Sequence, residues 1–403
     1  MSLLSKLEDA ETWERFYAYK TALVSSGPFV AELRRFLDEK AYLPVLQSSF
    51  QKERFPLPEK KLIRKLYTEK SRVVYSYPAA ESCVLKLLTY LMLRKYDGIF
   101  SSRLFSFRPG RTAKDAVRML LRTPGLDSLW CYKADVHNYF NSIPVGQLLP
   151  MLKDTLKDDP ALYAFLSRLL TEPCVLDRGK EITEEKGIMA GTPLSAFYAN
   201  LYLRDLDRRF EERGIPYARY SDDIILFAET KEDAESCRDE IRAFLSERGL
   251  SINPDKESFT APGEAFTFLG FSIAGRTIDI AEASVDKLKK KMRRKTRALK
   301  RWQERSGLER EKAAKAFIRI FRRKLLESPE GSELSWSLWF FPVINTTKSL
   351  KIIDRYAEDC IRFLMSGTRT KSRFNVRYGD LKALGFESLV HAYYSFEKSD
   401  KAE

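Results

Sequence analysis

Two adjacent aspartates, Asp222 and Asp223, stand between turn residues and an apolar run in "RYSDDIILFAE", residues 219–229. This pattern predicts a strand, a tight turn and a second strand that returns into a core, with both carboxylates at the tip of the hairpin. An ordinary surface hairpin is one interpretation, because Ser and Asp are common turn residues. A metal site is the other, and the rest of the chain has to decide between them.

A third carboxylate, Asp135, follows a buried-strand pattern in "SLWCYKAD" and precedes a helical one. If this strand neighbours the hairpin in one sheet, the three carboxylates meet at the sheet edge. Two-metal phosphoryl transfer needs carboxylates that hold ions about 3.5–4 Å apart. Mg²⁺ suits such a site because it takes oxygen ligands and keeps waters and substrate phosphates in its shell. A pair of aspartates in a turn is weak evidence by itself, and it is the order of the elements that favours a magnesium site.

The order of elements predicts an α+β core with added helical domains. Residues 1 to about 60 read as amphipathic helices that end at "FPLPEKK". Strand and helix patterns alternate in the middle of the chain, and the pattern becomes helical and basic from about 284.

Composition narrows the partners and the compartment. The chain has 70 Lys and Arg against 56 Asp and Glu, a net charge of +14, which favours a polyanionic partner, nucleic acid before an anionic membrane surface. No apolar stretch reaches the roughly 18 residues of a membrane span, so we expect no membrane partner. The five scattered cysteines include no CxxC pair, which predicts a reduced, cytoplasmic protein without a structural zinc site. With two histidines, a His-rich metal centre is excluded.

Several segments, in order, resemble the palm motifs of reverse transcriptases: "ADVHNYFNSIP", "GTPLSAFYANLYL", "YSDDIILFA", "LSINPDKESF" and "FTFLGF". "FSFRPGRTAKDA" resembles the fingers–palm junction of the bacterial, group II intron-like branch. The resemblance implies a right-hand polymerase with an N-terminal helical extension (1–60), fingers (61–115), palm (116–283, with fingers elements around 145–190) and a basic helical thumb (284–403). It also implies an RNA-directed DNA polymerase that uses dNTPs, an RNA template and two Mg²⁺, with Mn²⁺ as a substitute, and makes cDNA.

The same resemblance assigns the metal ligands. Asp135 and Asp222 would be the main ones, with Asp223 beside them and the carbonyl of Val136 as an extra ligand. Lys256 would protonate the departing pyrophosphate, although a solvated turn lysine is the alternative.

It also assigns nucleotide contacts. Phe140 would be the ring that blocks a ribose 2′-hydroxyl, with a core aromatic as the alternative. Arg72 and Lys70 would grip the triphosphate. Ala190 and Gly191 lie in "MAGTPLSAF", where group II intron enzymes usually carry glutamine at the position of Ala190, so the contact to the nucleotide or template is altered.

Basic residues mark the expected nucleic-acid contacts. Residues 287–305 hold eleven Lys and Arg against one Glu, and a thumb helix with this charge would contact phosphates in a salt-dependent, sequence-independent way. Within this helix Trp302 is either a core residue or a base-stacking one. Arg108 and Arg111 of "FRPGR" would hold a turn, contact template phosphates, or both. The expected contacts on the C-terminal side are Lys290, Arg294, Arg297 and Arg301 for the duplex and Arg373 for structured RNA.

The lineage expectation is a stand-alone bacterial enzyme of the "unknown group" that serves antiphage defence with a structured noncoding RNA. The retron hallmark "VTG" is absent, and the length leaves no room for an endonuclease module. An enzyme of a diversity-generating retroelement is the first alternative. A non-catalytic, maturase-like RNA scaffold is the second, although clustered carboxylates are costly without a metal. Template-independent synthesis on a protein tyrosine also stays open, as does the oligomeric state.

Overall fold

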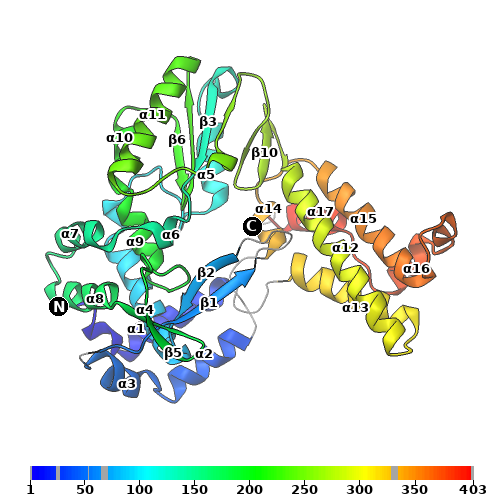
Figure 1. Ribbon diagram of the computed structural model, residues 1–403. Helices are drawn as coiled ribbons and strands as arrows, with labels where there is room; N and C mark the ends of the chain where they lie inside the picture. Colours follow the sequence, from blue (N-terminus) through cyan, green and yellow to red (C-terminus); the bar gives the residue numbers. More distant parts are fainter. Residues whose placement is uncertain (1, 24–27, 53, 65–70, 328–334, 401–403) are drawn as a thin grey trace. The chain divides into compact units, whose positions relative to one another are not determined.

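The computed structural model describes residues 2–23, 28–52, 54–64, 71–327 and 335–400 (Figure 1). The chain forms two compact units, Met1–Pro262 and Gly263–Glu403.

The first unit begins with short helices that pack on the longer helix α4 (Ala79–Lys95). Trp13 and Phe16 of α1 are buried, Trp13 stacks on Tyr42 with ring centroids 4.9 Å apart, and Phe16 meets Tyr90 of α4 edge to face at 5.3 Å. The expected N-terminal helices are thus present and join the core of this unit. They are η1 (Ser5–Leu7), α1 (Ala10–Leu23), α2 (Pro28–Asp38) and α3 (Tyr42–Val45).

A four-stranded sheet follows in the order β2-β1-β4-β5. Strands β1 (Glu59–Arg64) and β2 (Ser71–Ser76) form an antiparallel ribbon, and β4 (Cys174–Asp177) and β5 (Lys180–Thr183) form a second one beside it. The segment between 145 and 190 therefore returns to the strands near residue 60. Its helices are α7 (Val145–Thr155) and α8 (Pro160–Thr171).

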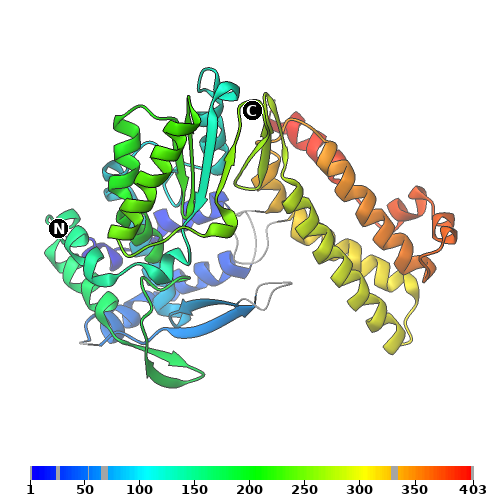
Figure 2. The same cartoon turned by 45° about the horizontal axis from the view of Figure 1, so that its top comes forward.

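The palm sheet has the order β6-β7-β3-β8 (Figures 1 and 2). Its strands are β6 (Tyr217–Tyr220), β7 (Asp223–Ala228), β3 (Trp130–Asp135) and β8 (Ser258–Thr260). Residues 224–227 of β7 are buried, as the apolar run predicts. Helix α11 (Lys231–Glu247) packs on β3 and β7, while α5 (Ala113–Leu121) and α10 (Arg204–Glu212) pack on β6. The short helix α6 (Tyr139–Ser142) follows β3, and α9 (Ser195–Tyr202) is buried beside it.

The second unit joins a small antiparallel sheet to a helical bundle. Its long helices α12 (Glu282–Arg305), α13 (Arg310–Leu325) and α15 (Lys348–Ser366) pack on one another (Figures 1 and 2). The basic helix expected from 284 is thus present. The remaining elements are β9 (Phe266–Phe268), β10 (Phe271–Ala274), β11 (Thr277–Ile280), α14 (Trp336–Phe340), α16 (Tyr378–Ala383) and α17 (Leu389–Asp400).

Strands β9, β10 and β11 form a sheet of their own, and the boundary between the two units falls at Pro262. One interpretation for this part of the chain is corrected. Trp302 has a side chain that is 43% exposed, so it is not a core residue. All five cysteines are free thiols, and none of the described helices is long and apolar enough to cross a bilayer.

Candidate metal centre and nucleotide site

The palm sheet brings the three predicted carboxylates together. Strand β3 pairs with β7 so that Asp135 lies opposite Asp223, and the N–H of Val136 donates to the carbonyl of Asp222 over 3.0 Å. One carboxylate oxygen of each aspartate lies within 4.8 Å of those of the other two. In the part of the chain that the structure describes, no other group of three His, Cys, Asp or Glu residues converges in this way. The condition set by the sequence, that the two strands be neighbours, is met.

Buried polar contacts hold the turn that carries Asp222. Ser221 has a left-handed backbone with φ of 61°, and its N–H donates to the hydroxyl of Ser106 over 2.8 Å. Below it, Arg219 is fully buried and donates to both oxygens of the equally buried Asp207 and to the carbonyl of Ser221. These partners were not predicted, because nothing in the sequence near residues 106 and 207 indicates that they meet the turn. The turn is therefore held by these buried hydrogen bonds as well as by the pairing of strands β6 and β7.

Burial and the charges of neighbouring aspartates raise the pKa values of Asp222 and Asp223. Burial, with the charge of Asp135, raises the pKa of Asp222 against the opposing effect of Lys256 and Arg72. Burial raises the pKa of Asp223 to about 6, although Lys133 opposes the shift. A divalent cation would remove both penalties, and a donor set of carboxylate oxygens alone matches what Mg²⁺ or Mn²⁺ takes. The residues present therefore fit such an ion.

Lys256 reaches this cluster from the short helix η5 (Pro254–Lys256). Its ammonium donates to Oδ2 of Asp135, and the backbone is held nearby because Asn253 N–H donates to the carbonyl of Asp135 over 2.8 Å. The side chain of Lys256 is still 47% exposed. Lys256 thus forms an ion pair with Asp135 while about half of its side chain stays open to solvent.

Phe140 lies on α6, five residues after Asp135, and is half-buried. Its ring contacts the ring of Tyr139 at 5.6 Å and that of Phe107 at 6.3 Å. It is therefore neither a deep core residue nor a free surface one.

Arg72 stands exposed on β2, and its charge lowers the pKa of Asp222, so it lies within electrostatic reach of the carboxylates. Lys70, the other residue expected at the triphosphate, lies outside the described residues.

The loop with Ala190 and Gly191 ties the palm to the fingers strand β2. The N–H of Ala190 donates to Oδ1 of Asn141 over 2.9 Å, and its carbonyl accepts from Tyr75 over 2.8 Å. The amide of Asn141 also donates to the carbonyl of Val73 over 3.0 Å. Gly191 has φ of 97° and is exposed. Asn141 was missed from the sequence, where it is one of two asparagines in "NYFNS" and carries no distinguishing signal.

Arg108 is corrected from a phosphate contact to a structural residue. It is 8% exposed, and its guanidinium makes five hydrogen bonds, to the carboxylate and carbonyl of Asp97 and to the carbonyls of Ser101 and Leu104. An arginine has five N–H donors, so none remains for a phosphate. Of the two interpretations of this arginine, holding the turn is the one that its bonds support.

The other basic residues are more accessible. Arg111 is half-buried, and one of its N–H groups donates to the carbonyl of Ser102 over 2.8 Å. Arg373 is bonded to Asp359 over 2.5 Å and to nearby carbonyls. Four exposed residues follow one another along α12 at helical spacing: Lys290, Arg294, Arg297 and Arg301.

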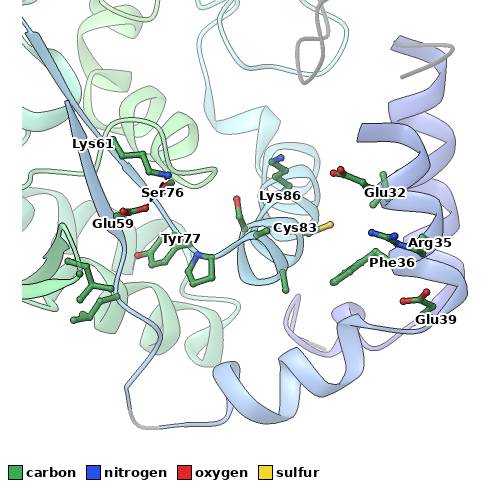
Figure 3. A pocket seen from close by; sticks show the side chains of 18 residues that line it. Glu32, Arg35, Phe36, Glu39, Glu59, Lys61, Ser76, Tyr77, Cys83 and Lys86 are labelled. Carbon is green, nitrogen blue, oxygen red and sulfur yellow. Dashed lines mark ion pairs between the residues drawn. The ribbon is translucent and has the colours of Figure 1, made fainter. Parts of the chain in front are cut away.

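A cavity of about 930 Å³ lies elsewhere in the first unit, between α2, β1–β2 and α4 (Figure 3). Glu32 and Arg35 of α2 face Lys86 of α4 and Lys61 of β1 across it. None of the three aspartates lines this cavity. The one group of three converging metal-ligand residues found among the described residues lies at the palm edge and not in this cavity.

Comparison with known proteins agrees with this geometry. Residues 57–273 match the family model described as "Reverse transcriptase (RNA-dependent DNA polymerase)". Retron Ec86 reverse transcriptase of Escherichia coli is 23% identical over 174 residues, which cover 42% of this chain and 50% of that protein. An uncharacterized 91 kDa protein in the cob intron of Schizosaccharomyces pombe is 27% identical over 131 residues, or 32% of this chain and 16% of that one. The mitochondrial nuclear intron maturase 2 of Arabidopsis thaliana is 28% identical over 109 residues, or 27% and 15%.

The chain thus spans half or less of the length of these relatives. Among solved structures, the apo telomerase of Candida tropicalis has a TM-score of 0.45 at 15% identity, covering 56% of this chain and 55% of that one. The telomerase of Candida albicans has a TM-score of 0.43 at 12% identity, covering 89% and 71%.

Proposed function

Because the chain belongs to the reverse transcriptase family, we propose that it is an RNA-directed DNA polymerase that extends a primer with dNTPs. The observation that carries this proposal is the convergence of Asp135, Asp222 and Asp223 within 4.8 Å, at the edge of a palm sheet inside the matched region.

The three aspartates would hold two Mg²⁺ or Mn²⁺ ions, with the carbonyl of Val136 as a further ligand. When bound, such ions lower the pKa of the attacking 3′-hydroxyl and stabilise charge on the leaving pyrophosphate. Lys256 keeps one oxygen of Asp135 paired, and its ammonium holds the proton that the departing pyrophosphate takes up. The hydrogen bonds beneath Ser221 keep the turn in place, so the carboxylates need little reorganisation.

The residues around the carboxylates would select and orient the nucleotide. Arg72 attracts the triphosphate from β2, with Lys70 as its proposed companion. Phe140 fills the space that a ribose 2′-hydroxyl would need. Ala190 and Gly191 offer the nucleotide no side-chain amide, so recognition there depends on the backbone that Asn141 holds.

Basic residues of the second unit would bind the nucleic-acid backbone. The row from Lys290 to Arg301 presents four cations on one side of α12, which suits the phosphates of an RNA–DNA duplex. Arg373 stands in a second basic segment that we assign to structured RNA, and Arg111 is proposed at the template strand.

We propose antiphage defence with a dedicated, structured noncoding RNA in the cytoplasm as the biological setting. The loss of the glutamine amide at Ala190 supports a stand-alone enzyme over an ordinary mobile-intron protein. A diversity-generating retroelement enzyme is the alternative on the same observation. The third candidate is a non-catalytic RNA scaffold, which the intron maturase relative favours, but three converging carboxylates would then be a cost without a use.

The test is sequencing of the nucleic acid that co-purifies with the full chain, expressed with its native flanking DNA. Discrete cDNA that disappears in the Asp222→Ala, Asp223→Ala variant, while a defined RNA stays bound, would support a polymerase with a dedicated template. RNA in both samples and cDNA in neither would support the scaffold.

A further inference from the structure

Phe107 has a conformation that neither local preference nor core packing explains. Its backbone is left-handed, with φ of 56°, and its side chain is 43% exposed. A bulky residue in this region is strained, because its Cβ approaches the backbone carbonyl. An exposed ring also gains little from burial. Strain of this kind, kept at the edge of a site, indicates a use for the side chain.

Both neighbours of Phe107 are fixed, so the strain cannot relax. Ser106 is fully buried; it accepts the N–H of Ser221 and exchanges two hydrogen bonds with Asn200. On the other side, the guanidinium of Arg108 makes its five bonds to the protein. The hydrogen bond between Ser106 and Ser221 attaches the loop of Phe107 to the turn of Asp222. The position of the Phe107 ring is therefore fixed relative to the carboxylates.

The ring of Phe107 meets that of Phe140 edge to face, with centroids 6.3 Å apart and an interplanar angle of 80°. Tyr139 contacts the same ring at 5.6 Å and 65°. Both angles are in the range that aromatic pairs prefer. Tyr139 is buried, with its hydroxyl bonded to the carbonyl of Ala199, whereas Phe107 contacts Phe140 from an exposed position.

We propose that Phe107 is a positioning residue: it holds the ring of Phe140 and thereby sets the discrimination between deoxyribo- and ribonucleoside triphosphates. This rests on the proposed polymerase function and on the assignment of Phe140 to the ribose. Without the ring of Phe107, Phe140 gains freedom to turn away from the 2′-hydroxyl position. Ribonucleotides then enter, while the three aspartates keep their places.

The experiment measures kcat and KM for single additions of a dNTP and the matching NTP by the full chain on a primed RNA template. In Phe107→Ala, the ratio of dNTP to NTP kcat/KM falls about tenfold, mainly through a lower KM for the NTP. Phe107→Tyr keeps the ring and retains the ratio. Phe107→Gly removes the ring and the backbone strain together, so the ratio falls although the melting temperature does not. The matched control is Tyr394→Ala, since Tyr394 is 50% exposed and meets Tyr393 at 5.7 Å, and it leaves the ratio unchanged.

A double variant shows whether Phe107 acts through Phe140. If it does, Phe107→Ala with Phe140→Ala has the same ratio as Phe140→Ala alone. A full further loss in the double variant would mean that Phe107 contacts the nucleic acid itself, and would overturn the proposal. So would normal dNTP addition with an unchanged ratio in Phe107→Ala. If the wild-type chain adds no nucleotide at all, the polymerase function itself fails, and this role of Phe107 fails with it.

Discussion

Arg219 and Asp207 form a fully buried ion pair, 2.6 Å between Nη2 and Oδ2, from which Arg219 also reaches the carbonyl of Ser221 in the turn before Asp222. Buried ion pairs are weak evidence for stability, but breaking one leaves an uncompensated charge in the core. This pair therefore links the stability of the palm to the placement of the turn that carries Asp222.

We expect Asp207→Ala to destabilise the palm by about 3–5 kcal/mol, because Arg219 is left buried and unpaired. Hydrogen exchange of the β6 and β7 amides under native conditions measures this loss. The matched control is Asp239→Ala, which breaks an ion pair with Arg238 whose aspartate is 62% exposed and should change stability by less than about 0.5 kcal/mol. Equal effects of the two variants would show that the buried pair does not brace the turn.

Gly191→Ala should loosen the junction between palm and fingers. A Cβ at Gly191 would lie 3.0 Å from the carbonyl oxygen of Tyr75, in a backbone with φ of 97°. Gly110→Ala is the matched control, since Gly110 has φ of 66° but no atom within 4 Å of its added Cβ. We expect the melting temperature of Gly191→Ala to be lower than that of Gly110→Ala by at least about 2 °C. The same melting temperature for both would mean that the loop is free to move.

Asp354 gives the second unit a pH dependence of known sign. It lies on α15, accepts the N–H groups of Leu389 and Val390 at the start of α17, and burial raises its pKa to about 6. Between the ordinary carboxyl pKa and 6, the folded chain binds more protons than the unfolded one. Stability therefore falls as pH rises through this window, by up to about 3 kcal/mol, and then levels off.

Hydrogen exchange of the α17 amides, corrected for intrinsic rates, checks this sign. The protection of α17 should fall from pH 4 to pH 7 in the wild type relative to Asp354→Asn, which cannot titrate. A difference between the two proteins that is flat with pH would contradict the raised pKa.

The basic row on α12 should contribute salt-dependent, sequence-independent affinity. Replacing all four residues (Lys290, Arg294, Arg297 and Arg301) by Gln should reduce the slope of log K against log salt by about 3. The matched control replaces four cations of the first unit by Gln: Arg213, Lys231, Arg238 and Arg242. Fluorescence anisotropy with a labelled RNA–DNA duplex at several salt concentrations gives both slopes. An equal reduction of the slope in both variants would mean that the α12 row contributes no more to binding than other cations of the chain.

The carboxylate cluster was predictable from the sequence because strand periodicity places Asp135 and Asp223 at strand ends. Because residues 224–227 are apolar and must be buried, the hairpin has to place its turn, with the aspartates, away from the core. What holds the hairpin was not predictable. In "RYSDD", Arg219 has the polar neighbours typical of an exposed residue. Its partner Asp207 lies twelve positions earlier on a helix. Only the packing of α10 against β6 brings the two together.

Other differences also depend on pairing between distant segments. For Arg108 the sequence left a turn-holding role and a template contact open, because its partner Asp97 lies eleven residues away. The separate sheet of β9–β11 was not predictable either, because hydrophobic alternation does not reveal which sheet a strand joins. The left-handed backbone of Phe107 was not predictable, because a bulky residue rarely adopts it.

The most direct measurement is primer extension by the purified full chain on an RNA template with dNTPs and Mg²⁺, beside Asp222→Asn and its control Asp239→Asn. We expect cDNA from the wild type and from Asp239→Asn. In Asp222→Asn, a loss of more than about 100-fold should accompany RNA affinity within about threefold of wild type, because one metal ligand is lost and the fold is kept. Synthesis by Asp222→Asn at the wild-type rate would contradict the assignment of the metal centre, and the absence of synthesis by the wild type would contradict the polymerase function.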